Sequence, residues 1–202
     1  MNTSLPLPVR EQPVLQAPGA GLPPFESWIL TKAAAPLVSR FLARPQARRL
    51  FIREGERIIY LLEDANEYRL NESVLIKRPI GIEDSSRAWS LSETAEHVMI
   101  VGNGIRNLII QLCSGHRPGG KFNVAKVKPL GGLGTDARKL MRQYLDRFTR
   151  DLDNLRFPKH PTYLHPWYGE LNATQWYQYA ALHHRMHRIQ AQRIEFGLLN
   201  QL

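Results

Sequence analysis

The sequence predicts an all-α protein: a four-helix bundle preceded by an extra N-terminal helix and a proline-rich arm. Three observations support this fold class. Amphipathic segments of about 20 residues occur four times along the chain, strand-like segments are short, and no repeat of fixed period is present. Hydrophobic residues make up 43% of the 202 residues, which is enough to form a buried core.

Residues 1–24 contain six prolines, and we expect them to form a disordered or draped arm. Each proline fixes φ and removes a backbone donor, so neither a helix nor a sheet interior can form there. The segment also lacks the basic start and apolar block of a signal peptide. Residues 25–202 form the predicted helical domain, which begins with a helix over residues 25–42 that Pro36 interrupts.

The first long helix is predicted over residues 47–66, because Phe51, Ile58 and Leu62 fall on one stripe. A row of arginines on another side of this helix is expected to face solvent. Residues 67–88 are expected to form a long connection with a short extended piece over residues 74–76.

A capping box marks the start of the second long helix, since Ser90 is followed three residues later by Glu93. Its predicted core-facing stripe contains Val98, Val101, Ile105, Leu108 and Leu112. The glycine-rich loop over residues 115–134 is long enough to let the next helix run parallel to this one. The basic residues of this loop are expected to be solvated, and the alternative is that they face an acidic ligand such as the carboxylate of a thiol cofactor: His116, Arg117, Lys121, Lys126 and Lys128.

The third long helix is predicted over residues 135–155, where apolar residues recur every three or four positions and Thr135 is expected to cap the start. The last helix is predicted to begin at Asn172, because Gln175 completes a second capping pattern. Its predicted inner face contains Trp176, Ala180, His183, His187 and Ile194.

The net charge of +9 attracts polyanions without specificity. No zinc finger, RNP-type aromatic motif or block of five basic residues is present, so we do not expect nucleic acid as the partner.

No apolar run approaches the length of about 20 residues that a membrane span needs. The single cysteine, Cys113, excludes a disulfide scaffold and a cysteine-based zinc cluster, and it is expected to be a buried, inert thiol. We expect a cytoplasmic protein.

Three of the seven histidines lie on predicted core stripes. His183 and His187 are four residues apart, so their Cβ atoms lie about 6 Å apart on one helix face. Two imidazoles at this spacing can hold one divalent ion, and His97 from a facing helix would complete a set with open positions for water or substrate. His184 points about 100° away on the same helix and is expected at the rim or surface.

A structural role is the competing interpretation, because a lone inward histidine is usually a satisfied core residue and an i, i+4 pair occurs by chance. Against it, three imidazoles that converge inside an apolar bundle are hard to satisfy by hydrogen bonds alone. A divalent cation takes one lone pair from each ring, and each second ring nitrogen then needs an acceptor. Glu93, one turn before His97, is a candidate acceptor, although it also belongs to the capping box.

Two segments resemble the DinB/YfiT superfamily. Residues 89–97, from Trp89 through Ser90 to His97, are similar to the start of the superfamily's second helix, which carries its first ligand histidine. Residues 165–190 are similar to the C-terminal signature of a DinB-like branch: His-Pro, an aromatic residue, glycine, a Thr-x-x-Gln/Glu-Trp-like helix start, HxxxH and glutamine. The likeness spans residues 47–195.

This resemblance implies an up-down-down-up four-helix bundle with zinc or nickel on His97, His183 and His187. It also implies a thiol-dependent transferase or a hydrolase that acts on a small molecule, with a low-molecular-weight thiol as a further cofactor. We expect a homodimer. Two other functions stay open: a non-catalytic bundle whose structural metal supports dimerisation or partner binding, and a polyanion-binding basic protein. No acid or base can be named, and the arm and the 115–134 loop depart from the pattern.

Overall fold

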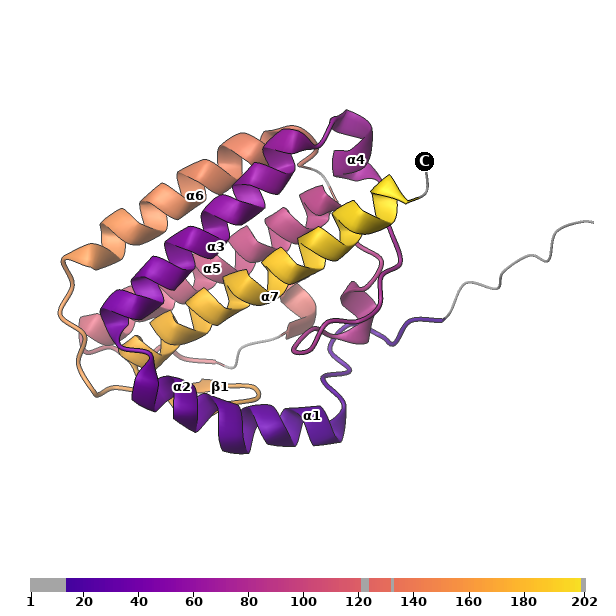
Figure 1. Ribbon diagram of the computed structural model, residues 1–202. Coiled ribbons are helices and arrows are strands. Elements are labelled where there is room, and N and C mark those ends of the chain that lie inside the picture. The colour runs from indigo at the N-terminus through magenta and orange to yellow at the C-terminus, as the bar shows by residue number, and fades with distance from the viewer. Residues whose placement is uncertain (1–13, 121–123, 132, 201–202) are drawn as a thin grey trace, which may run out of the picture.

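The computed structural model describes residues 14–120, 124–131 and 133–200. This part of the chain is mostly helical and has one two-stranded sheet, which confirms the all-α prediction. Four long helices lie side by side (Figure 1). Their bounds are α3 (Arg44–Asp64), α5 (Leu91–Cys113), α6 (Asp136–Asp153) and α7 (Ala173–Leu199).

Helix α3 packs against α6 and α7, and α5 packs against the same two helices. Arg44, at the start of α3, donates to the carbonyl of Leu152 near the end of α6, with 2.8 Å between nitrogen and oxygen. At the opposite end, Arg138 at the start of α6 donates over 2.9 Å to the carbonyl of Leu62 near the end of α3. Helices α3 and α6 are therefore antiparallel.

Helices α5 and α6 run in the same direction, as the long link between them allows. Gly102 of α5 faces Tyr144 of α6, and further along both helices Arg106 forms an ion pair with Asp151. The described part of the link contains a short 3-10 helix, η3 (Val124–Val127). Figure 1 shows that α3 and α7 also run in the same direction. The pair α3 and α7 is therefore antiparallel to the pair α5 and α6.

The core-facing residues predicted for the four long helices are buried, and in the third helix these are Ala137, Met141, Tyr144, Phe148 and Leu152. Leu155, the last apolar residue predicted for that helix, lies just beyond α6 and is half-buried. Both predicted capping boxes are present, at Ser90 and at Asn172. Thr135 occupies the cap position of α6, but its side chain makes no capping hydrogen bond, so this detail of the prediction is wrong.

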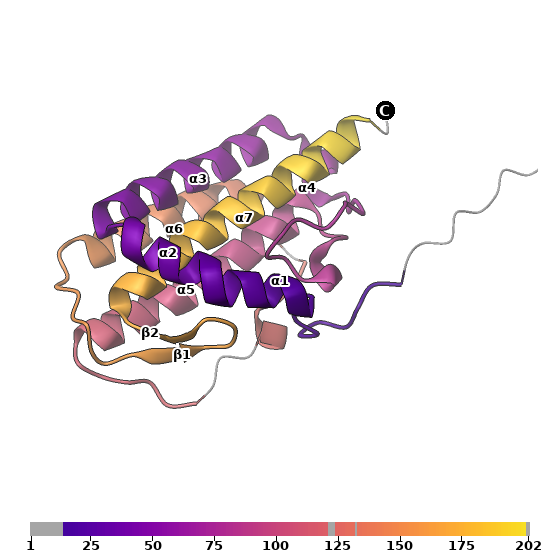
Figure 2. The same ribbon diagram turned by 60° about the horizontal axis from the view of Figure 1, so that its bottom comes forward.

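The predicted helix over residues 25–42 is present in three parts: α1 (Pro24–Ile29), the π-helical turn η1 (Leu30–Ala34) and α2 (Ala35–Phe41). Pro36 has no amide hydrogen, so a widened turn before it accommodates the ring without ending the helix. We call residues 24–41 the strap, because it lies across α7 and the hairpin (Figure 2).

The connection over residues 67–88 contains two short helices that the sequence did not predict, α4 (Glu67–Asn71) and η2 (Asp84–Ser86). Before α7, β1 (Tyr163–His165) pairs antiparallel with β2 (Gly169–Leu171), and this hairpin was not predicted either. Within the described ranges, no helix is long and apolar enough to cross a lipid bilayer.

The described part of the predicted arm lies against the connection before α5. The amides of Gly19 and Gly21 donate to the carboxylate of Glu83 over 3.2 and 3.1 Å, and the amide of Gln16 donates to Asp84 over 2.9 Å. This segment is thus draped over the domain. The rest of the predicted arm, residues 1–13, lies outside the described residues.

Candidate metal centre

The structure brings His97, His183 and His187 together. His97 extends from α5 and the other two extend from α7, which packs against it. One ring nitrogen from each histidine lies within 4.8 Å of the others, and all three residues are buried. Two helices distant in sequence therefore form the cluster that the histidine spacing predicted.

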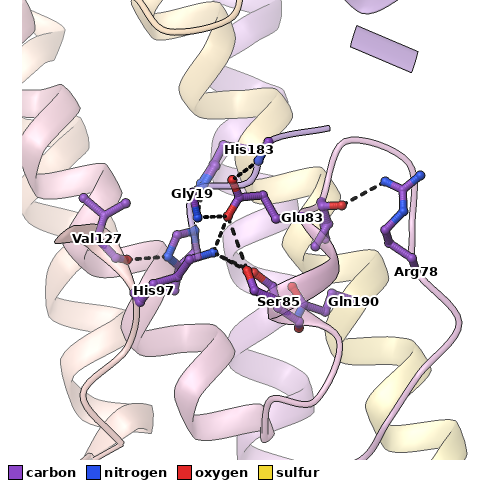
Figure 3. Close-up of polar contacts among 12 residues, drawn as sticks. Gly19, Arg78, Glu83, Ser85, His97, Val127, His183 and Gln190 are labelled. Atoms are coloured by element: carbon purple, nitrogen blue, oxygen red, sulfur yellow. Dashed lines mark hydrogen bonds and ion pairs between the residues drawn. The ribbon is translucent and has the colours of Figure 1, made fainter. Parts of the chain in front are cut away.

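The proton on the His97 ring is placed by the loop before α6. Its Nδ1 atom lies 2.6 Å from the carbonyl oxygen of Val127 (Figure 3). A carbonyl only accepts hydrogen bonds, so Nδ1 holds the proton and Nε2 presents a lone pair. That Nε2 lies 3.3 Å from Nε2 of His183.

The proton on the His187 ring is placed in the same way by a side chain one turn later. Nδ1 of His187 lies 2.7 Å from Oε1 of Gln190, whose amide nitrogen donates over 2.6 Å to the carbonyl of Ser86. The second bond fixes the orientation of the amide, so its oxygen faces the imidazole. Nδ1 of His187 is consequently the donor, and its Nε2 is a second lone pair in the cluster.

A divalent ion fits this arrangement. Tetrahedral coordination at ordinary metal–nitrogen distances separates two imidazole nitrogens by about 3.3 Å. The two Nε2 atoms of His97 and His183 have this separation. Without a cation, one of them must hold a proton to avoid two facing lone pairs. With a cation, both lone pairs are satisfied by the same ion.

Burial keeps these rings neutral. The pKa of His97 is lowered to about 4, mainly by burial and to a smaller extent by the positive charge of Lys128, against the opposing effect of the Val127 hydrogen bond. Burial also holds the pKa values of His183 and His187 well below their usual range, and the neighbouring imidazoles act in the same direction. Neutral imidazole is the form that binds a metal.

A cavity of about 40 Å³ lies beside the three rings. That is room for a water molecule or a small ligand group, so the cluster has space for a further ligand. Besides the histidine cluster, the polar side chains that line it include Glu83, Ser86, Lys128 and His165.

Lys128 corrects the prediction that the basic residues of the loop are all solvated. Its ammonium group lies 2.6 Å from Glu83 and donates over 3.1 Å to the hydroxyls of Ser85 and Ser86. The reason is the buried carboxylate, which needs a counter-charge. Burial alone would raise the pKa of Glu83, but Lys128 and the amides of the arm hold it below its usual range.

The other loop residues follow the prediction where they are described. His116 and Lys126 are exposed, and Arg117 forms an ion pair with the exposed Glu170. Lys121 lies outside the described residues.

His184 is buried, so the prediction that it lies at the rim or surface is wrong. Its Nδ1 donates over 3.0 Å to the carbonyl of Phe51, and its Nε2 accepts over 2.9 Å from the hydroxyl of Tyr144. Helix α7 packs against α3 as well as against α5. The face of α7 that contains His184 is therefore buried against α3, although it points about 100° away from His183. Both ring nitrogens are satisfied, which makes His184 a structural residue.

Glu93 is not the acceptor for His97. Its carboxylate accepts from the amide of Ser90 over 2.8 Å, so it serves the capping box, and Val127 holds the imidazole instead. Cys113 is half-buried, and burial raises the pKa of its thiol, which agrees with an inert side chain.

His165 belongs to the cavity wall but was not among the predicted site residues. Its Nδ1 accepts from the amides of Trp167 and Tyr168 over 3.1 and 3.3 Å, so the neutral ring has its proton on Nε2. Burial lowers the pKa of His165 to about 3. The only sequence signal was the His-Pro pair within the resembling segment.

No protein-family model, curated protein or solved structure matches this chain. The fold and the site define a class of protein: a mostly helical chain with a buried three-histidine cluster that can hold a metal ion.

Proposed function

We propose that this chain is a metal-dependent enzyme of the DinB/YfiT type, folded as an up-down-down-up four-helix bundle, that acts as a thiol-dependent transferase or hydrolase. The helix directions support the bundle, since α3 is antiparallel to α6 while α5 runs with α6. The observation on which the proposal depends is the 3.3 Å separation of the two Nε2 atoms of His97 and His183.

His97, His183 and His187 would hold the ion, with zinc or nickel the expected metal. When bound, a divalent ion lowers the pKa of a thiol or a water molecule and so makes it a nucleophile at neutral pH. Val127 and Gln190 keep two of the imidazoles in the tautomer that offers Nε2. The cavity beside the histidines is small and the three rings are buried, so bulk water is excluded from the site.

Two hydrogen-bond donors on the cavity wall suit the binding of a substrate oxygen. Lys128 provides an ammonium group and His165 provides its Nε2 proton. Glu83 holds Lys128 in place, so this charge is fixed before a substrate arrives. We propose that these groups orient the substrate beside the ion.

Cobalt substitution tests this proposal. Cobalt-loaded protein is titrated with cysteine, glutathione or 2-mercaptoethanol, and a sulfur-to-cobalt absorption band is expected, whereas serine and ethanol produce none. The matched control is the triple variant His97→Ala/His183→Ala/His187→Ala, which should give no band. A loaded site with no thiol band and no hydrolysis of ester, amide or phosphate substrates would overturn the proposal.

A non-catalytic role is the second candidate, and two observations favour it. The ligands are almost fully buried and the cavity beside them is small, as in a structural site. The strap also exposes large apolar side chains, as a dimer surface would: Phe25, Trp28, Leu37 and Phe41. In this case His97→Ala lowers the melting temperature but abolishes no turnover, and Phe41→Glu converts a dimer to a monomer in light scattering.

A further inference from the structure

We propose that the cavity between the strap and α7 is a binding site for an anionic amphiphile: an elongated apolar chain that ends in a carboxylate. This site is separate from the histidine cluster, and binding there does not need a metal. Four features support the proposal: the shape of the cavity, its apolar lining, its arginines and its position beside the metal centre.

The shape suits an elongated ligand. The cavity has a volume of about 720 Å³, within the range of small-molecule sites. Its wall on α7 follows one face of the helix at steps of three and four residues. That wall contains Gln175, Gln178, Tyr179, Leu182, Arg185, Met186 and Ile189. At 1.5 Å per residue, this face extends about 21 Å along the helix.

The opposite wall is the strap, whose C-terminal end is attached to α7 by side-chain hydrogen bonds. Gln175 donates over 3.0 Å to the hydroxyl of Ser39, and Gln178 donates over 2.6 Å to the carbonyl of Leu42. Most side chains that line the cavity are aliphatic or aromatic, and on the strap they include Leu30, Pro36 and Val38. An apolar chain is the ligand that such walls bind best.

The charged groups on the walls select an anion. Arg40 and Arg185 both line the cavity, and neither forms an ion pair or donates a hydrogen bond to another described residue. The acidic residue on the lining, Glu170, is already engaged by Arg117 and by the hydroxyl of Thr162. The lining thus has two arginines without an acidic partner among the described residues, and the guanidinium carbon of Arg40 lies 5.6 Å from the centre of the exposed Phe41 ring. Guanidinium binds carboxylate well.

The cavity is next to the metal centre. Gly81, Tyr179 and Met186 line both spaces, so a chain bound along α7 lies beside the smaller cavity at the histidines. Gly81 has φ of +83°, and a Cβ atom there would collide with Met186. A side chain at this position would thus be strained and would move the wall that the two cavities share.

Isothermal titration calorimetry of the metal-free full chain with decanoate tests the proposal. One decanoate is expected to bind per chain, with affinity falling about fourfold for each methylene removed in nonanoate and octanoate. Decyltrimethylammonium has a matched chain and the opposite charge, and it should not bind at this site. Absence of decanoate binding, or equal binding of the cation, would overturn the proposal.

Two variants locate the binding. Arg40→Ala/Arg185→Ala should weaken decanoate binding by about tenfold or more, because a charge-assisted bond is lost, and should leave decan-1-ol binding unchanged. Val38→Trp should abolish binding of both by filling the cavity. The control is Arg49→Ala, an exposed arginine of α3 outside the cavity lining. Circular dichroism shows that each variant is folded, and unchanged affinity in the double variant contradicts the assignment.

The metal-ligand variant separates this result from the proposed function. The triple histidine variant, once shown to be folded, should bind decanoate as the metal-free protein does. Binding that disappears only in that variant would show that the histidine cluster holds the carboxylate, and would overturn the assignment to the arginines.

Discussion

The side chain of Gln190 connects the imidazole of His187 to the main chain of the connection before α5. Its oxygen accepts from Nδ1 of His187 over 2.7 Å, and its nitrogen donates to the carbonyl of Ser86 over 2.6 Å. Gln190 is fully buried, so neither bond has water as a substitute. The tautomer of His187 therefore depends on a residue that is not itself a ligand.

Replacing Gln190 with leucine should lower metal affinity about 10- to 100-fold, because His187 loses the acceptor that fixes its proton on Nδ1. Competition titration against a metal-binding dye measures the affinity. Gln192→Leu, an exposed position on the same helix, is the control and should leave the affinity unchanged. Equal affinities in the two variants would show that Gln190 does not tune the site.

Elemental analysis of purified protein should give one divalent ion per chain, and none in the triple variant His97→Ala/His183→Ala/His187→Ala. His116→Ala is the matched control, since this histidine is exposed and outside the cluster. A full metal content in the triple variant would place the ion elsewhere and contradict the site.

Two glycines of α5 should respond oppositely to alanine. A Cβ at Gly102 would lie 2.7 Å from Cε2 of Tyr144 and closer still to its hydroxyl, which bonds His184. Gly102→Ala should therefore lower the free energy of unfolding by about 1–3 kcal/mol. Gly104 has nothing within 4 Å of the added carbon, so Gly104→Ala should raise stability by about 0.5–1 kcal/mol. Urea denaturation of metal-free protein measures both, and equal effects would contradict the packing described.

Stability should fall in acid, partly because of His165. Its pKa is about 3 in the folded protein and near its ordinary 6.5 in the unfolded chain, so between these values the unfolded chain binds more protons. The stabilisation is complete above pH 6.5 and decreases as the pH falls, by about 1.4 kcal/mol per pH unit.

His165→Asn removes this titration and keeps an acceptor for the amides of Trp167 and Tyr168. Urea denaturation of the metal-free protein at pH 7, 6 and 5 should show a shallower decline in the variant than in the wild type. Parallel declines would mean that His165 does not titrate on unfolding.

Signals within a few residues were enough to predict the long helices and their core faces. The capping boxes at Ser90 and Asn172 and the stripe from Val98 to Leu112 are as predicted. Short elements were missed, since α4 and the hairpin are stabilised by a single cap or by a few cross-strand bonds. The burial of His184 was also missed, because the spacing of residues on one helix does not say how many neighbours cover it.

The sequence by itself determined the four long helices and placed three histidines on inward faces, because periodicity and capping act within one or two turns. Only the tertiary structure decided which groups complete the site: the carbonyl of Val127 behind His97, the amide of Gln190 behind His187, and Lys128 turned inward to Glu83. It also created the cavity beneath the strap. These features join surfaces far apart in the chain, so they exist only once the helices have packed.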